Sequence, residues 1–584
     1  MKRYKKYILP YLSAFIIGPL MMLTEVAGEI MLPRLMSYII NNGVANHDTA
    51  YILRIGGLMI FAVLVMIIGG TLGTYFAAKA SICFTSDLRR DIFKKVQRFS
   101  FANIDAFSTG SLVTRLTNDI QQVQNVLTMG LKMALRAPGM FVGALIMAFM
   151  MNLRLALIIL VVIPLLLGTI ILILKTAFPR FQIMQEKLDK LNSGIQEALM
   201  NVRVVKSFVR EDFEIQKFSG LNEDLKEGSM RALKIVIMTM PVMMLAMNLT
   251  TLAVVWYGGN LIIGGNMPVG DLTAFTTYIV QILMSLMMLS MVFLQSSRAQ
   301  ASLVRINEVL DTEIDLNDEG ASHKEKKVEA GRIEFKDVSF GYARENGISD
   351  LVLEHISFTA EPGQTIGIIG STGSGKTSLV QLIPRLYDVS EGQVLVDGVD
   401  VREYSLRHLR DGVGMVLQKN DLFSGTIEEN LRWGDEEAAD EEISAAARSA
   451  QAEDFIKSFK FQYQSDIGQG GAGVSGGQKQ RLCIARALLK KPKILILDDS
   501  TSAVDTATEA RIRESFSGER KDITKLIIAQ RISSVQDADL ILVLEEGKII
   551  GKGTHEELLK SCTAYEEIYM TQTGSARMGE EVSE

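Results

Sequence analysis

Three short motifs in the carboxyl-terminal half of the chain have the residue types and spacing that nucleotide binding requires. The first fits the pattern G-x-x-x-x-G-K-S/T, in which glycines allow backbone N–H groups to turn toward phosphate oxygens. An apolar segment typical of a buried strand, residues 364–369, precedes it, and a helix is predicted from Leu379 onward. This strand–loop–helix context is the one in which the motif binds phosphate. Its members are Gly370, Ser371, Thr372, Gly373, Ser374, Gly375, Lys376 and Thr377.

The polar side chains of these motifs predict ATP and Mg²⁺ as ligands. Lys376 is expected to neutralise β- and γ-phosphate oxygens, and the Thr377 hydroxyl is expected to bind Mg²⁺. A second apolar strand, residues 494–497, ends at Asp498, the expected water-bridged partner of the metal ion. Between these two motifs lies the third, Ser475-Gly476-Gly477-Gln478.

The amino-terminal half has the composition of a membrane domain. All but three of the 29 methionines (Met415, Met570 and Met578) lie before residue 301, and the long apolar runs stop there. Each run reaches the ~20 residues that a helix needs to cross about 30 Å of hydrocarbon. A tight turn at residues 152–154 is needed to separate the third run from the fourth. The six predicted spans are roughly 8–40, 51–80, 124–151, 155–178, 232–264 and 268–297.

The distribution of Lys and Arg predicts the orientation of these spans. The first, third and fifth connections hold almost no basic residues, whereas the second and fourth hold six or more each. The positive-inside rule therefore places the amino terminus and the two long connections in the cytoplasm. Six crossings return the chain to the cytoplasm. The basic residues include Arg89, Arg90, Lys94, Lys95, Arg98 and Arg115 in the second connection, and Lys187, Lys190, Arg203, Lys206, Arg210 and Lys217 in the fourth.

Charge and cysteine content argue against other classes. A net charge of −6 without a basic stripe gives no reason to expect nucleic acid as a partner. The three cysteines are far apart, so neither a disulfide framework nor a zinc site is predicted.

In their order and spacing, these features resemble an ABC transporter of the exporter type, specifically a half-transporter. Residues 1–310 resemble its six-helix membrane domain, and residues 332–570 resemble its nucleotide-binding domain. A charged linker, 311–331, separates the two, and a polar tail, 571–584, is expected to be disordered. The resemblance implies a multidomain fold: an all-α transmembrane domain followed by an α/β phosphate-loop ATP-binding cassette.

The same resemblance assigns roles to further residues. Tyr342 matches the aromatic residue that stacks on adenine, and Gln418 matches the glutamine that contacts Mg²⁺ and faces the membrane domain. Residues 502–505 resemble the loop that communicates between two ATP sites. Two cytoplasmic segments, 101–111 and 202–213, are candidates to contact the ATP domain. The signature residues Ser475, Gly476, Gly477 and Gln478 match those that cap the γ-phosphate bound on the opposite subunit.

Two positions that would take part in ATP hydrolysis depart from the family pattern. The family has a glutamate, which polarises the attacking water, where this chain has Asp499; the shorter side chain loses about 1.5 Å of reach. The family has a histidine at Gln530, and glutamine cannot carry the positive charge that a protonated histidine offers. General-base catalysis contributes roughly 10²–10⁴-fold. Together these changes predict a degenerate site that binds ATP and hydrolyses it slowly.

A degenerate site beside an intact signature predicts a heterodimer. The partner would be a second half-transporter with the glutamate and the histidine, and this chain would complete the partner's competent ATP site. The resemblance implies an ATPase that drives multidrug-type efflux from the bacterial plasma membrane. A homodimer with two slow sites, and a regulatory membrane protein gated by ATP without pumping, are the alternatives.

The membrane half suggests hydrophobic or amphipathic cargo, such as drugs, lipids or peptides. Its methionines and phenylalanines suit varied apolar molecules, although they are also common filler. Glu25 and Glu29 lie four residues apart on one face of the first span, where carboxylates are costly. They are candidates for contact with cationic cargo or for a gate, and pairing with Arg34 or with a partner helix is the structural alternative.

Overall fold

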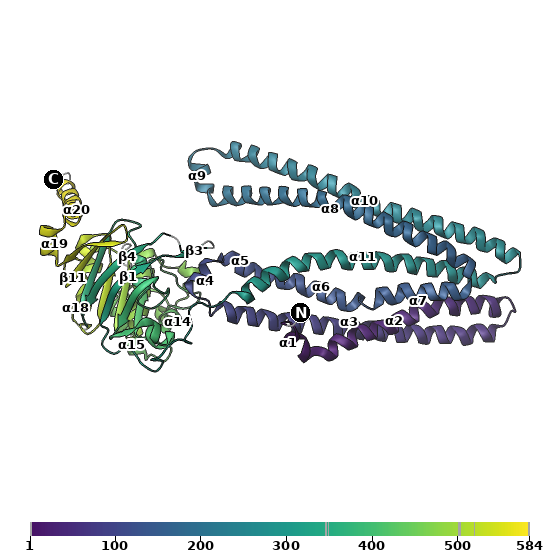
Figure 1. Ribbon diagram of the computed structural model, residues 1–584, viewed down its shortest axis with the longest axis horizontal. Helices are drawn as coiled ribbons and strands as arrows, with labels where there is room; N and C mark the ends of the chain where they lie inside the picture. The colour runs from purple at the N-terminus through teal and green to yellow at the C-terminus, as the bar shows by residue number, and fades with distance from the viewer. Residues whose placement is uncertain (1–2, 345–346, 349, 500–503, 519, 582–584) are drawn as a thin grey trace. The chain divides into compact units, whose positions relative to one another are not determined.

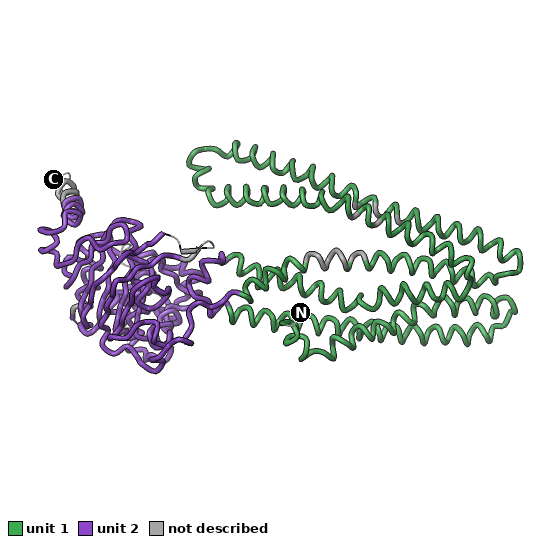
Figure 2. The backbone as a smooth tube through the Cα atoms, viewed as in Figure 1, with its two compact units in different colours: residues 1–95, 110–311 green, residues 96–109, 312–584 purple. Residues whose placement is uncertain are grey.

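The chain forms two compact units (Figure 2). The computed structural model describes residues 3–344, 347–348, 350–499, 504–518 and 520–581. The first unit contains residues 1–95 and 110–311, and the second contains residues 96–109 and 312–584. The short segment 96–109 therefore belongs with the carboxyl-terminal half, although it lies within the helical part of the sequence.

The first unit is entirely helical and confirms the six predicted spans. Within the described residues, six helical segments are long and apolar enough to cross a membrane: Lys5–Val44, Thr49–Val96, Thr109–Met151, Leu153–Met200, Glu211–Ile263 and Val269–Leu289. Their helices are α1 (Lys5–Ile8), α2 (Leu12–Tyr38), α3 (Thr49–Val96), α5 (Thr109–Thr114), α6 (Ile120–Met133), α7 (Arg136–Met151), α8 (Leu153–Met200), α10 (Glu211–Ile263) and α11 (Val269–Asp311).

The turn predicted between the third and fourth spans is confirmed. Asn152 caps α8, and its side-chain oxygen accepts hydrogen bonds from the N–H groups of Arg154 and Leu155. Helix α8 has 48 residues, about 72 Å at 1.5 Å per residue, so it extends far beyond 30 Å of hydrocarbon. It packs along α10 as a hairpin whose tip is the short helix α9, Val202–Ser207 (Figure 1).

The third span is interrupted where α6 ends and α7 begins. Pro138 lies in the first turn of α7, where its missing N–H has no intrahelical partner in any case. The interruption makes Arg136 the first residue of α7. A charged residue therefore lies at a helix start within the third span.

The second unit is built around two main sheets. Strands β4 (Leu353–Ala360), β1 (Ile333–Phe340), β6 (Glu391–Val396) and β7 (Val399–Asp400) form an antiparallel sheet in that order. The larger sheet has the order β12-β11-β5-β10-β9-β8, and only its edge strand β12 is antiparallel. A two-stranded ribbon, β2–β3, pairs Ala343–Arg344 with Gly347–Ile348. The larger sheet contains β5 (Thr365–Gly370), β8 (Val413–Val416), β9 (Ile494–Asp498), β10 (Thr524–Ile528), β11 (Leu540–Glu545) and β12 (Lys548–Gly553).

Two apolar cores hold the second unit together. One lies between the two main sheets, and the other lies between the parallel sheet and the helices that follow β8, β9 and β12. The near-continuous apolar strands β5, β9 and β10 are covered on both faces, as parallel strands usually are. The helices are α4 (Phe101–Asp105), α12 (Lys376–Gln381), α13 (Leu406–Asp411), α14 (Ile427–Arg432), α15 (Asp440–Ser449), α16 (Glu453–Ser458), α17 (Gly476–Leu489), α18 (Thr506–Gly518), α19 (His555–Ser561) and α20 (Thr563–Glu581).

Residues 571–581 of the carboxyl-terminal tail, expected to be disordered, belong to a helix instead. Helix α20 begins inside the globular core and continues to Glu581. Tyr565 is fully buried and its hydroxyl lies 2.8 Å from Nδ1 of His555. The polar composition of the tail suggested disorder, but the anchored first turns of α20 provide a nucleus from which the helix extends.

Candidate ATP-binding site

The predicted phosphate-site residues gather at one edge of the parallel sheet. Strands β5, β10, β9 and β8 are parallel neighbours, so their carboxyl ends lie side by side. The phosphate loop follows β5, and Gln530 lies two residues after β10. Asp498 ends β9, Asp499 follows it, and Gln418 comes two residues after β8. Ligands of open α/β sheets bind at this edge.

The phosphate loop has a conformation that only glycine accommodates at Gly375. This residue has φ of 91°, and a Cβ atom there would lie 2.7 Å from a Leu353 methyl carbon and 2.9 Å from the Val352 carbonyl oxygen. Inside the loop, the Lys376 ammonium donates to the carbonyl oxygens of Gly370 at 2.8 Å and Ser371 at 2.6 Å. Burial lowers the pKa of Lys376, whereas the neighbouring carboxylates act in the opposite direction. The loop therefore holds the Lys376 ammonium in place with carbonyl oxygens that accept its hydrogen bonds.

Thr377 and Asp498 are in contact, as the sequence predicts for a Mg²⁺ site. The Thr377 hydroxyl donates to Asp498 Oδ1 at 3.1 Å. Asp498 is 1% exposed, and its Oδ2 has no hydrogen-bond partner among the described residues. Burial raises the pKa of this carboxyl group. A buried carboxylate oxygen beside a threonine hydroxyl needs a cation, so the residues present fit Mg²⁺.

The two residues that depart from the family pattern contact each other. Gln530 Nε2 donates to Asp499 Oδ2 at 2.8 Å. The contact follows from the register, because Ile528 pairs with Asp498 and the next residues of both strands remain adjacent. Asp499 has φ of 48°, a left-handed conformation that aspartate adopts more readily than most residues. Burial raises its pKa, and the Gln530 amide partly offsets this effect.

Tyr342 lies beside the helix that follows the phosphate loop. Its hydroxyl is 2.9 Å from Ser378 Oγ, one residue beyond Thr377. Its ring contacts Phe340 and makes an edge contact with Tyr387, with the centroids of Tyr342 and Tyr387 5.2 Å apart. The ring is partly buried. This is a suitable place for a face that stacks on adenine.

Tyr387 also contacts the first candidate coupling segment, a contact that no sequence pattern predicts. Its hydroxyl donates to Asp105 Oδ2 at 2.6 Å, and its ring meets that of Phe101 edge-on. Burial, followed by the Asp105 hydrogen bond, raises the pKa of Tyr387. Tyr387 thus joins helix α4 to the tyrosine predicted to hold adenine. The second candidate segment, 202–213, forms α9 and the start of α10 in the first unit.

The signature residues form a closed capping box at the start of α17. Ser475 Oγ accepts from the Gln478 N–H at 3.3 Å, and Gln478 Oε1 accepts from the Ser475 N–H at 2.8 Å. Ser475 and Gly476 are exposed, and Gly477 is partly so. Gln418 lies in the loop after β8, and its carbonyl accepts from the Asn420 side chain. Residues 502–503 of the predicted communicating loop lie outside the described residues.

In the first unit, Glu25 and Glu29 pair with Arg136 rather than with Arg34. Arg136 Nη2 lies 2.8 Å from Glu29 Oε1 and 3.2 Å from Glu25 Oε1. Arg34 instead pairs with Asp271 at 3.3 Å. Of the two structural alternatives, pairing with another helix is found, through α7, and pairing with Arg34 is not, for a geometric reason. At 3.6 residues per turn, Arg34 is rotated by about 140° from Glu29 and about 180° from Glu25.

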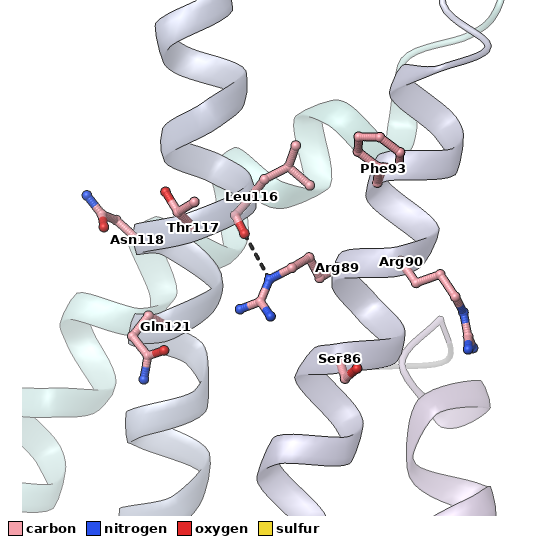
Figure 3. Close-up of a pocket in the computed structure, with 8 residues that line it drawn as sticks. All are labelled: Ser86, Arg89, Arg90, Phe93, Leu116, Thr117, Asn118 and Gln121. Carbon is pink, nitrogen blue, oxygen red and sulfur yellow. Dashed lines mark hydrogen bonds between the residues drawn. The ribbon is translucent and has the colours of Figure 1, made fainter. Parts of the chain in front are cut away.

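A separate hollow in the first unit contains none of the ATP-site residues. It has a volume of about 600 Å³ and lies between α3 and the segment 116–121 (Figure 3). Arg89 Nε donates to the Leu116 carbonyl across it at 3.1 Å. Its walls are Ser86, Arg89, Arg90, Phe93, Leu116, Thr117, Asn118 and Gln121.

Six membrane-spanning helices joined to a phosphate-loop sheet define a class: membrane transporters with a fused ATP-binding cassette. A family model described as the ABC transporter transmembrane region matches residues 15–286, and one described as ABC transporter matches residues 353–502. The chain belongs to the ABC transporter family and is an exporter half-transporter, with an ATPase domain that implies transport coupled to ATP hydrolysis.

Several relatives match along nearly their whole length. An uncharacterized ABC transporter ATP-binding protein of Bacillus subtilis, YfiB, is 40% identical over 98% of this chain and 99% of its own. An ATP-dependent lipid A-core flippase of Pseudomonas aeruginosa is 33% identical over 95% of this chain and 93% of its own. A bacterial Atm1-family ABC exporter, solved with ATP bound, has the same fold. It has a TM-score of 0.77 at 24% identity, over 97% of this chain and 98% of that one.

Proposed function

We propose that this chain is the degenerate-site subunit of a heterodimeric ATP-driven exporter. Its own phosphate loop holds one ATP that is hydrolysed slowly, and its signature completes the competent ATP site of the partner. The observation that carries the proposal is the 2.8 Å hydrogen bond between Gln530 and Asp499. The two altered side chains satisfy each other, so the amide that would face the γ-phosphate is engaged with the carboxylate that would polarise water.

The groups that bind ATP are intact in this chain. Lys376 offers a positive charge to phosphate oxygens, and Tyr342 offers an aromatic face to adenine. Thr377, Gln418 and Asp498 would hold Mg²⁺, which neutralises phosphate charge when bound. ATP binding and ATP hydrolysis use different residues. The two residues that would serve hydrolysis, Asp499 and Gln530, are the ones that differ from the family pattern.

The signature supports the other half of the proposal. Ser475, Gly476, Gly477 and Gln478 lie at the start of a helix, with exposed backbone and a hydroxyl held in place by the capping box. Such a surface suits the γ-phosphate of an ATP bound on a partner subunit that has the catalytic glutamate and histidine. ATP sandwiched in both sites would draw the two cassettes together and open the cargo path outward.

The cargo we propose is hydrophobic or amphipathic, with a cationic group favoured at the first span. Glu25, Glu29 and Arg136 together carry one net negative charge. Glu29 Oε2 and Gln281 Oε1 are buried acceptors without a hydrogen-bond partner among the described residues. An ammonium group would supply donors to both. The lipid A-core flippases among the relatives support a lipid as one possible cargo class.

We also propose the plasma membrane as the location, with both termini and the cassette in the cytoplasm, on the strength of the basic second and fourth connections. The domain boundaries that fit this arrangement are 1–310, 311–331, 332–570 and 571–584.

The test is the ATPase rate of the full-length chain purified alone in lipid nanodiscs. We expect ATP binding with turnover at least about 10²-fold slower than after reconstitution with its partner, given the size of general-base effects. Rapid turnover by the chain alone would contradict the heterodimer and support a homodimer. ATP-dependent dye accumulation in inverted vesicles separates a pump from an ATP-gated regulatory protein, which would accumulate none.

A further inference from the structure

Gln572 of the carboxyl-terminal helix α20 makes two hydrogen bonds to the loop that carries Gln530. Gln572 Nε2 donates to the Gln530 carbonyl at 2.9 Å, and Gln572 Oε1 accepts from the Ile532 N–H at 2.8 Å. A side-chain amide has a donor end and an acceptor end, and here both ends are used on the same loop. The backbone on both sides of Arg531 is therefore attached to α20.

This loop carries Gln530, whose side chain contacts Asp499, the other altered residue. The Gln530 side chain donates to Asp499, while its own carbonyl accepts from Gln572. Three hydrogen bonds thus connect α20 to the loop, and the loop to the carboxylate that follows β9. Both the side chain and the backbone carbonyl of Gln530 are therefore hydrogen-bonded within the cassette.

Helix α20 is itself packed against the core of the second unit. Tyr565, Ile568 and Gln572 are at positions i, i+3 and i+7, so they lie on one face of the helix. Tyr565 is fully buried in the core that covers the parallel sheet, and Ile568 packs against the same core. The face that holds α20 on the unit is the face that presents Gln572 to the loop.

We infer that Gln572 is a positioning residue for hydrolysis at this chain's own ATP site. It holds the Gln530 backbone, and through it the Asp499 carboxylate on which the slow residual hydrolysis depends, in one geometry. A loop released from both hydrogen bonds samples more positions, and a displacement of ~1 Å at a reacting group costs on the order of 10²-fold in rate. The inference rests on the proposed role of Asp499 and Gln530.

The test compares Gln572→Met with the unchanged full-length chain in nanodiscs. Methionine has nearly the same length but no amide, so packing is kept and both hydrogen bonds are lost. We expect the single-turnover rate constant for ATP hydrolysis to fall by about tenfold, part of the ~10²-fold that misplacement can cost. ATP affinity should stay within about twofold, because no binding group is touched. Hydrogen exchange at the Ile532 amide should become faster.

Two further variants separate positioning from a merely structural effect. Gln572→Glu keeps the acceptor for Ile532 but loses the donor to Gln530, so it should give an intermediate rate. Glu566→Ala changes an exposed residue elsewhere on α20 and should match the unchanged chain in rate and in exchange.

Each outcome of these measurements supports or contradicts the positioning role of Gln572. An unchanged hydrolysis rate in Gln572→Met with faster amide exchange would show that the bridge exists but positions nothing, and unchanged exchange would contradict the bridge itself. Fast hydrolysis by the unaltered chain would contradict the slow site we propose, yet the ratio between the variant and the unaltered chain would still test Gln572.

Discussion

The two regions of the cassette that we propose contact nucleotide differ in how they are built. The signature, Ser475–Gln478, is made by four consecutive residues whose hydrogen bonds close on one another. The phosphate edge is assembled from the ends of four parallel strands that are far apart in the sequence. The signature retains the family pattern, and both altered residues are at the phosphate edge.

On the proposed function, ATP binding and ATP hydrolysis are separable at the same edge of the sheet. Lys376, Thr377 and Asp498 would bind phosphate and Mg²⁺, while Asp499 and Gln530, which follow β9 and β10, hydrogen-bond to each other. Such a site would hydrolyse ATP slowly and still bind it. The comparison predicts that variants in the two regions will affect different ATP molecules.

The largest expected effect comes from the signature. In the complex with its partner, Ser475→Arg should lower transport by about 10²-fold or more, because it removes a γ-phosphate contact at the competent site and adds bulk. Asp499→Asn should lower transport by less than about threefold, since this carboxylate contributes little to turnover. Dye efflux from vesicles, normalised to the amount of complex, measures both.

Equal losses in the two variants would contradict the asymmetry. Lys376→Met serves as the control, because it removes ATP binding from the phosphate edge and should disrupt the closed dimer whichever site is competent.

The next largest effect is a gain. The double variant Asp499→Glu with Gln530→His restores both family residues, and we expect the ATPase rate of the chain alone to rise by about 10²-fold. Either single change should give less, because the 2.8 Å contact couples the two positions. Phosphate release in nanodiscs measures it. No gain in the double variant would place the defect elsewhere in the cassette.

The phosphate edge could be predicted from sequence because its pattern is local at each strand. A buried strand followed by a glycine-rich loop or an acidic residue marks a carboxyl end, and parallel strands bring those ends together. The six spans could be predicted equally well, since the length and hydropathy of each apolar run identify them. Even the turn at Asn152 followed from the length of the combined apolar run.

Contacts between side chains distant in sequence could not be predicted this way. Asp105 and Tyr387 are 282 residues apart, and Gln530 and Gln572 are 42 apart. Nothing in their own neighbourhoods marks these residues as partners. Arg136 was missed for the same reason. The expectation for Arg34, in contrast, could have been corrected from helical spacing alone.

A smaller effect is expected where helix α4 meets the phosphate edge. Tyr387→Phe keeps the ring contacts with Phe101 and Tyr342 but loses the hydrogen bond to Asp105, a bond to a charged group worth about 1.5–3 kcal/mol before solvent screening. We expect transport to fall by about threefold while ATP affinity is unchanged. Binding of a fluorescent ATP analogue, measured beside dye efflux, tests this.

The conservative variant Asp105→Asn retains an oxygen that accepts from Tyr387 and should lose less transport. A parallel loss of ATP affinity in Tyr387→Phe would instead assign this tyrosine to nucleotide binding, and the phosphate edge would then extend to α4.

The smallest expected effect is a shift in pH dependence. Burial raises the pKa of Asp499, and the hydrogen bond from Gln530 lowers it in part. Only the ionised carboxylate accepts a proton from water, so residual hydrolysis should fall as the pH drops through this raised pKa. Gln530→Leu removes the donor, so the pKa rises further and the acidic limb of the rate profile moves to higher pH. Single-turnover hydrolysis across pH, with the Asp499→Asn variant as a control that lacks the limb, measures the shift. A limb that stays in place in Gln530→Leu would mean that the contact does not govern this carboxylate, and the alteration at position 530 would then act on the nucleotide alone.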